Sequence, residues 1–85
     1  METRIAVIST IVENNDKIDE LNNIFHEYGE YIIGRMGIPY RKKNVNIISV
    51  VIDAPQDKIA TLSGKIGNLE GISSKTAYSK VISED

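Results

Sequence analysis

Apolar residues in this chain follow a strand-like pattern in two segments, residues 3–13 and 45–53. Both segments are short β-branched runs in which odd and even positions alike are apolar. A strand with two apolar faces is typical of the middle of a sheet, because other parts of the protein lie against both of its faces. The pattern therefore predicts that these two segments are central strands.

Helical spacing appears in two other segments. Between Ile18 and Tyr28 the apolar residues fall at i, i+3, i+7 and i+10, and residues 14–16 before them have cap-competent side chains. The same spacing recurs from Ile59 to Leu69, and the preceding Pro55 suits the first turn of a helix. We expect one helix in each segment, with Gly29 ending the first.

Two further segments have the weaker pattern of edge strands. Residues 30–40 contain β-forming residues interrupted by two glycines and by Pro39, and proline cannot donate a hydrogen bond to a sheet ladder. Residues 71–81 contain few apolar residues among serines and lysines. The polar residues 41–44 predict a hairpin loop between the first edge strand and the second central strand.

The resulting order of strand, helix, strand, strand, helix, strand is that of the ferredoxin-like βαββαβ fold. We predict one α+β domain over residues 1–85, with a four-stranded antiparallel sheet in the order 4-1-3-2 and both helices on one face. In that topology the first and third strands are central. This agrees with their two apolar faces and with the proline in the second strand.

Composition narrows the class of protein. Hydrophobic residues at 41% and charged residues at 26% are ordinary globular values, and no apolar run is long enough to cross a bilayer. No signal-peptide pattern is present at the N-terminus, so we expect a cytoplasmic protein without membrane contact. Without cysteine there is no disulfide and no thiolate metal site. Ten basic against twelve acidic residues argue against direct nucleic-acid binding.

The first candidates for ligand binding are Arg35, Tyr40 and Arg41, which are followed by Lys42 and Lys43. They form a cationic and aromatic segment around the edge strand and the hairpin. Guanidinium groups bind carboxylate or phosphate through two parallel hydrogen bonds, so the ligand would be anionic. The alternative is that these charges only protect the edge strand from unwanted pairing.

The next candidates for ligand binding are His26 and Tyr28, at the end of the first predicted helix. His26 is the only histidine, and one imidazole without cysteine cannot build a typical transition-metal site within a single subunit. It is either a surface residue or a ligand-sensing residue whose charge changes near neutral pH. We expect no metal, no cofactor and no catalytic residues.

Ser9 and Ser49 are a third pair of interest, because each is a small polar residue within a predicted central strand. They are either small residues fitted beneath a helix or the floor of a ligand cleft. We favour the packing interpretation.

Several segments together resemble one protein family, that of the iron-only hydrogenase system regulators. They contain the pieces Glu-Tyr-Gly, Gly-Arg-Met-Gly-x-Pro-Tyr-Arg and Leu-x-Gly-Lys-x-Gly-Asn, and they are His26–Arg41, Ile47–Asp53, Leu62–Asn68 and Gly71–Lys75. The resemblance implies a stand-alone ACT-like domain, similar in fold to the effector-binding half of the nickel-responsive repressor. It also implies a regulatory association with hydrogenase or iron–sulfur metabolism. It does not extend to a nickel site, because the repressor's histidine and cysteine ligands have no matching cluster here.

Together these observations predict a non-enzymatic regulatory module that binds a small anionic effector or a protein partner. The alternative is a small enzyme whose active site assembles between subunits, with His26 as acid or base and Arg35 holding an anionic substrate. A third hypothesis, direct DNA binding, is disfavoured by the charge balance.

The predicted sheet also implies self-association, because two helices can cover only one of its faces. In the first strand Ile5, Val7 and Ile11 oppose Ile8 and Val12, and in the third strand Val45, Ile47 and Val51 oppose Ile48, Val50 and Ile52. One set would face water in a monomer, and soluble monomers rarely expose a contiguous apolar patch of that kind. We predict a symmetric homodimer or homotetramer, with the open sheet face and residues 31–40 at the contacts.

Overall fold

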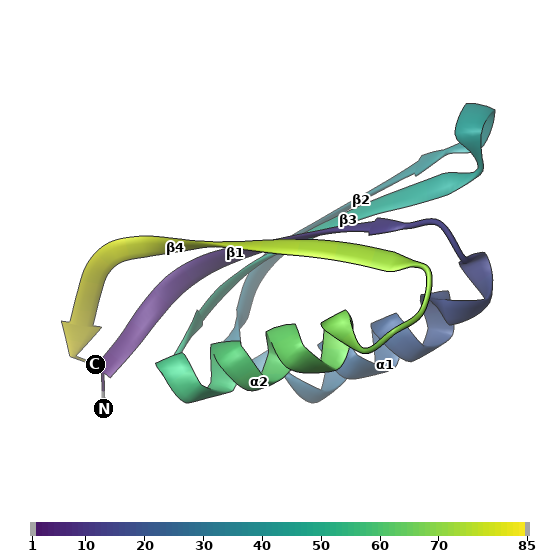
Figure 1. Cartoon of the computed structure of the whole chain (residues 1–85). Helices are drawn as coiled ribbons and strands as arrows, with labels where there is room; N and C mark the ends of the chain where they lie inside the picture. Colours follow the sequence, from purple (N-terminus) through teal and green to yellow (C-terminus); the bar gives the residue numbers. More distant parts are fainter. Residues whose placement is uncertain (1, 85) are drawn as a thin grey trace.

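The computed structural model describes residues 2–84, and side chains up to Val81. Its strands and helices are β1 (Glu2–Val12), α1 (Ile18–Glu27), β2 (Ile32–Tyr40), β3 (Val45–Ala54), α2 (Gln56–Gly67) and β4 (Ile72–Glu84). Short 3-10 turns lie at Asn15–Lys17 (η1), Gly29–Tyr31 (η2) and Arg41–Lys43 (η3). The strands form one antiparallel sheet in the order β2-β3-β1-β4 (Figure 1). The predicted ferredoxin-like fold and strand order are therefore confirmed.

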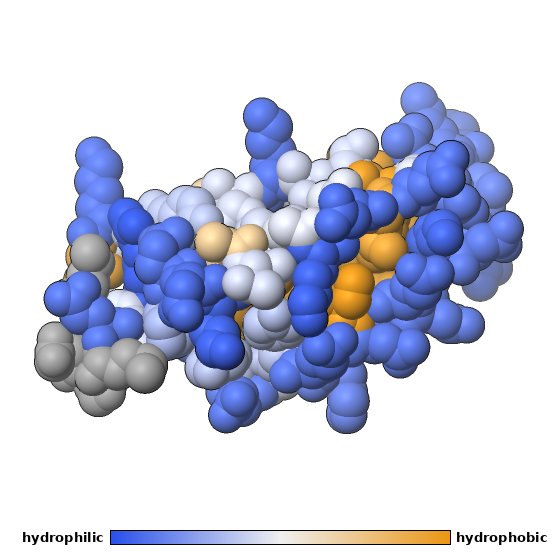
Figure 2. Space-filling model, turned by 60° about the horizontal axis from the view of Figure 1, so that its bottom comes forward, coloured by the Kyte–Doolittle hydropathy of each residue, from blue (hydrophilic) through white to orange (hydrophobic). Residues whose placement is uncertain are grey.

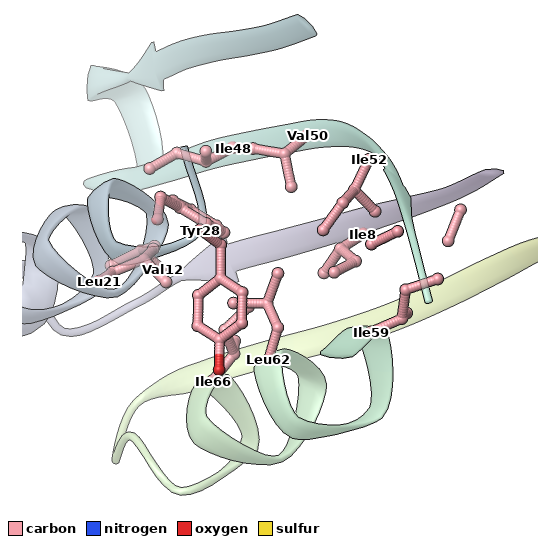
Figure 3. Close-up of a cluster of buried hydrophobic side chains, with 13 residues drawn as sticks. Ile8, Val12, Leu21, Tyr28, Ile48, Val50, Ile52, Ile59, Leu62 and Ile66 are labelled. Carbon is pink, nitrogen blue, oxygen red and sulfur yellow. The ribbon is translucent and has the colours of Figure 1, made fainter. Parts of the chain in front are cut away.

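Both helices lie on the same side of the sheet, and the hydrophobic core lies between them and β1 and β3 (Figures 1 and 3). Leu21 and Phe25 of α1 are almost fully buried there, and so are the three large apolar residues of α2. The strands contribute alternate residues, because successive side chains of a strand point to opposite faces. The main core residues are Ile8, Val12, Leu21, Phe25, Ile48, Val50, Ile52, Ile59, Leu62 and Ile66.

The other alternate residues of β1 and β3 point away from the helices. No helix within residues 2–84 lies over this second face, which is the upper side of the sheet in Figure 1. We call it the open face. The outer side of the helical layer is different in character, since hydrophilic side chains predominate there and apolar surface is limited (Figure 2).

The first helix and the second strand differ slightly from their predicted limits. α1 ends at Glu27, and Tyr28 rather than Gly29 closes it, with the Tyr28 N–H bonded to the Phe25 carbonyl at 3.1 Å. Gly29 then begins turn η2, so β2 starts at Ile32 and not at residue 30. A bulge between Ile32 and Gly34 follows directly, which is a common adjustment at a sheet edge.

Two residues with positive φ close the loops. Asn44, at φ 54°, ends the hairpin between β2 and β3, and asparagine is one of the few residues that tolerate this conformation. Gly71, at φ 77°, precedes β4 and packs against Asn14. The Gly71 carbonyl accepts hydrogen bonds from the backbone N–H groups of Glu13 and Asn14, at 2.8 and 3.2 Å. Gly71 thus joins the end of β1 to the start of β4.

Alanine at two glycines should change stability in opposite directions. Gly71→Ala should destabilise the protein by more than about 1 kcal/mol, because its φ is unfavourable for alanine and the new Cβ would overlap Asn14. Gly64→Ala should stabilise it by about 0.5–1 kcal/mol, because Gly64 lies inside α2 and a Cβ there meets no atom within 4 Å. Urea unfolding of both variants beside the wild type measures the two changes. Equal effects of the two substitutions would contradict the loop geometry.

Candidate functional site

The structure places Arg35 on the helix side of the sheet, where it contacts α1. Arg35 pairs with Val50, a core residue, and alternate residues share a face. Its guanidinium donates a hydrogen bond to Asn22 Oδ1 and lies 5.3 Å from the centre of the Phe25 ring. A cation over an aromatic ring is attracted by the ring's negative face. These contacts give Arg35 a structural role in joining β2 to α1.

Tyr40 and Arg41 lie elsewhere, at the outer end of the β2–β3 hairpin. This end projects beyond the helices, and we call residues 36–47 the hairpin arm (Figure 1). Tyr40 pairs with Val45 on the open face and is 42% exposed, while Arg41 is exposed in turn η3. Within residues 2–81, neither side chain makes a hydrogen bond or ion pair. Of the predicted cationic and aromatic group, the structure therefore brings together Tyr40 and Arg41 but not Arg35.

His26 and Tyr28 form a third location, at the C-terminal end of α1. His26 is exposed, whereas Tyr28 is only 7% exposed and belongs to the core cluster. Lys65 of α2 crosses to this end, with its Nζ 3.1 Å from Glu27 Oε2 and 5.3 Å from the Tyr28 ring centre. The hydrogen bond to Glu27 raises the pKa of Lys65; desolvation lowers it by a smaller amount, and the Glu27 charge adds a further, lesser increase. Lys65 therefore keeps its positive charge at neutral pH and joins α2 to α1.

Three asparagines that the sequence reasoning missed attach the outer end of the hairpin arm to turn η1. Asn15 Nδ2 donates to Asn44 Oδ1 at 3.0 Å, and Asn46 Nδ2 donates to Asn15 Oδ1 at 2.9 Å. They connect turn η1 to both the loop and the return strand of the arm. Their sequence separation of about thirty residues explains why no local pattern indicated the cluster.

The open face carries most of the large exposed hydrophobic side chains found in residues 2–81. Its members come from β1, β2 and β3, whose register places them on the same side. They are Ile5 (45% exposed), Ile11 (48%), Met36 (56%), Ile38 (45%) and Tyr40 (42%), together with the half-buried Val7, Val45, Ile47 and Val51. The prediction that these residues of β1 and β3 share an uncovered face is confirmed.

Ser9 and Ser49 lie at the middle of this open face. They are direct partners across β1 and β3, and their Oγ atoms are 3.2 Å apart. The expectation that they fit beneath a helix is wrong, because both point away from the helical layer. Each hydroxyl can satisfy the other, so the pair interrupts the apolar surface without leaving an unpartnered polar group.

The described part of the chain contains no group of three or more histidine, cysteine, aspartate or glutamate side chains that could hold a metal ion. None of its helices combines the length and apolar character needed to cross a membrane. A hollow of about 180 Å³ lies at the end of the sheet opposite to the arm and is lined by Glu2, Thr3, Arg4 and Gln56. Arg4 is already engaged there, with Nε 2.7 Å from the Ser79 carbonyl and one terminal nitrogen 2.9 Å from Gln56 Oε1. None of the predicted ligand-binding residues lines this hollow.

Comparisons with known proteins agree with the fold and the resemblance. The TM1266-like family model, described as "Iron-only hydrogenase system regulator, putative", matches residues 4–76, a range that contains every segment on which the resemblance was based. The solved structure of the uncharacterized protein TM1266 from Thermotoga maritima is 32% identical in sequence, and the match covers 92% of this chain and 99% of that one with a TM-score of 0.87. A formyltetrahydrofolate deformylase from Pseudomonas putida KT2440 is 13% identical over 86% of this chain and 28% of its own, with a TM-score of 0.63, which shows a shared fold. A search of curated proteins gave no match.

Alanine at the two arginines should separate their roles. Arg35→Ala should lower the free energy of unfolding by about 1 kcal/mol, because it removes an exposed cation–π contact and a hydrogen bond to α1. Arg41→Ala should change it by less than about 0.5 kcal/mol, since an exposed turn residue has little to lose. Denaturant unfolding of both variants is the measurement. A larger loss for Arg41→Ala than for Arg35→Ala would show that the roles are assigned the wrong way round.

Proposed function

The chain belongs to the TM1266-like family of iron-only hydrogenase system regulators, and from this membership we propose that it is a non-enzymatic regulatory module. In this proposal it acts as a homo-oligomer and binds an anionic group, on a small effector or on a protein partner. The contact is made by the hairpin arm. Regulation then follows from the occupied or empty state of that arm.

The observation that carries the proposal is the exposure of the arm. Tyr40 presents an aromatic ring on one side, and Arg41, Lys42 and Lys43 form a basic turn at the tip. Arginine recognises carboxylate or phosphate by paired hydrogen bonds, and a neighbouring tyrosine adds contact area with little loss of side-chain entropy. An exposed aromatic side chain beside free cationic groups is a frequent arrangement at binding surfaces.

The contacts of Arg35 favour a regulatory module over an enzyme. The enzymatic alternative requires Arg35 to hold an anionic substrate near His26. The Arg35 guanidinium is already bonded to Asn22 and stacked on Phe25, so substrate binding would have to break contacts that join β2 to α1. His26 is exposed to solvent, whereas a general acid or base usually works in a site from which water is excluded.

Deletion of the gene in its own organism tests the regulatory proposal. We expect the deletion to change the transcript level and activity of the hydrogenase, and the wild-type gene to restore both. A Tyr40→Ala/Arg41→Ala double variant should fail to restore them, because it removes the aromatic and cationic contacts of the arm. Transcript quantification and hydrogen production are the two readouts.

Lys58→Ala provides the matched control, because Lys58 is an exposed cation on α2, away from the arm. This variant should restore the hydrogenase as well as the wild type does. Unchanged hydrogenase transcript and activity in the deletion strain would contradict the regulatory role. Full restoration by the Tyr40/Arg41 double variant would contradict only the proposed role of the arm and would leave the regulatory role standing.

A further inference from the structure

The open face contains two opposite charges that cannot reach each other within one molecule. Asp53 pairs with Ile5 across β3 and β1, and Lys75 pairs with Ser9 across β4 and β1, so both side chains lie on the open face. Strand spacings of ~4.8 Å and residue spacings of ~3.3 Å put their Cα atoms roughly 16 Å apart. Within residues 2–81, Asp53 makes no side-chain hydrogen bond or ion pair, and its Oδ1 has no partner. Its carboxylate can therefore still accept a hydrogen bond from an incoming donor.

Val7 lies at the midpoint between these two charges. It pairs with Val51 of β3 and with Ala77 of β4. Asp53 is two residues beyond Val51 in one direction, and Lys75 is two residues from Ala77 in the opposite direction. The two charges are therefore at diagonally opposite positions around Val7.

From this arrangement we propose that a second copy of the chain packs on the open face about a two-fold axis at Val7. An axis that runs in the plane of the interface and perpendicular to the diagonal exchanges the two charged positions. Lys75 of each copy then meets Asp53 of the other, and the apolar residues around Val7 are buried between the two pairs. The same patch serves both copies, as in any two-fold dimer interface. This proposal names the interface of the homo-oligomer and rests on the proposed function for that oligomeric state.

The size of the open face suits such a dimer. Four strands at ~4.8 Å and about seven residues at ~3.3 Å span roughly 19 by 23 Å, which is about 450 Å² per copy before the relief of the side chains is counted. The two copies together therefore bury about 900 Å². The uneven surface of the side chains and the adjoining arm increase this total toward the ~1,000 Å² that a biological interface should exceed. Its apolar centre with charges at the sides also resembles the usual core and rim of an interface.

Charge reversal tests the axis directly. In sedimentation experiments across micromolar concentrations, the wild type should form a dimer. Lys75→Asp and Asp53→Lys should each raise its dissociation constant by about tenfold or more, because each variant creates two like-charge contacts across the axis. The double variant Lys75→Asp/Asp53→Lys should restore the wild-type value. Lys58→Asp, the same charge change on α2, should have no effect.

Cross-linking gives a second test that does not depend on charge. The chain has no cysteine, so Val7→Cys introduces a single thiol next to the proposed axis. A short bis-maleimide should convert this variant into a covalent dimer, whereas Ala60→Cys on the exposed side of α2 should still dimerise but should not be cross-linked, so it should run as a single chain under denaturing conditions. Circular dichroism of each variant establishes that it is folded.

The outcomes separate the interface from the function. A wild-type monomer at high micromolar concentration overturns the interface and the homo-oligomer together. A dimer whose charge-reversed double variant stays as weak as the single variants, or whose Val7→Cys form is not cross-linked, overturns this interface alone. Failure of the regulatory role appears instead in the hydrogenase readouts of the deletion strain, which do not depend on the oligomeric state.

Discussion

The structure depends on the burial of one side of a four-stranded sheet beneath two helices. Ile8 and Val12 of β1 and Val50 and Ile52 of β3 have almost no exposed surface, because α1 and α2 lie directly over them. This layer supplies nearly all of the apolar core, and burial of apolar surface is the main favourable term in folding. This core accounts for the stability of one subunit. Ile5 and Ile11 on the opposite side of β1 are nevertheless about half exposed. The second apolar face therefore needs an explanation other than the stability of one subunit.

The hairpin arm is a second part of the chain that adds little to the core. The arm, residues 36–47, extends past the helices, so its outer end contributes little to the core (Figure 1). It is fixed instead by polar contacts near its outer end, where Asn15 bonds to both Asn44 and Asn46, and by the stacking of Arg35 on Phe25 beside its base. These contacts hold the orientation of the arm, while the side chains of turn η3 stay exposed. Loops and projections on a rigid scaffold are where binding residues most often occur.

The sequence was sufficient for the fold but not for the geometry of the candidate site. Segments 3–13 and 45–53 were apolar on both faces, which indicated central strands, and Pro39 indicated an edge; the sheet order confirms both. Strand alternation could also have separated Arg35 from Tyr40, since odd and even positions point to opposite faces. The partner of Arg35 on α1 and the asparagine cluster could not be predicted, because both arise from tertiary contacts between distant residues. The sequence pattern also did not show which face of the sheet the helices cover, so it did not show on which side Ser9 and Ser49 lie.

The edges of the sheet explain why association should use its face. On β2, Pro39 removes a backbone donor and the bulge at Ile33 disturbs the ladder, and both features discourage another strand from pairing there. On β4, the register with β1 shifts between Arg4 and Ala6, so its C-terminal part also departs from a regular edge. Pairing through edges can continue from copy to copy without limit, whereas packing of one face against its own copy stops at two. For a chain with irregular edges and one apolar open face, we therefore expect closed association to use that face.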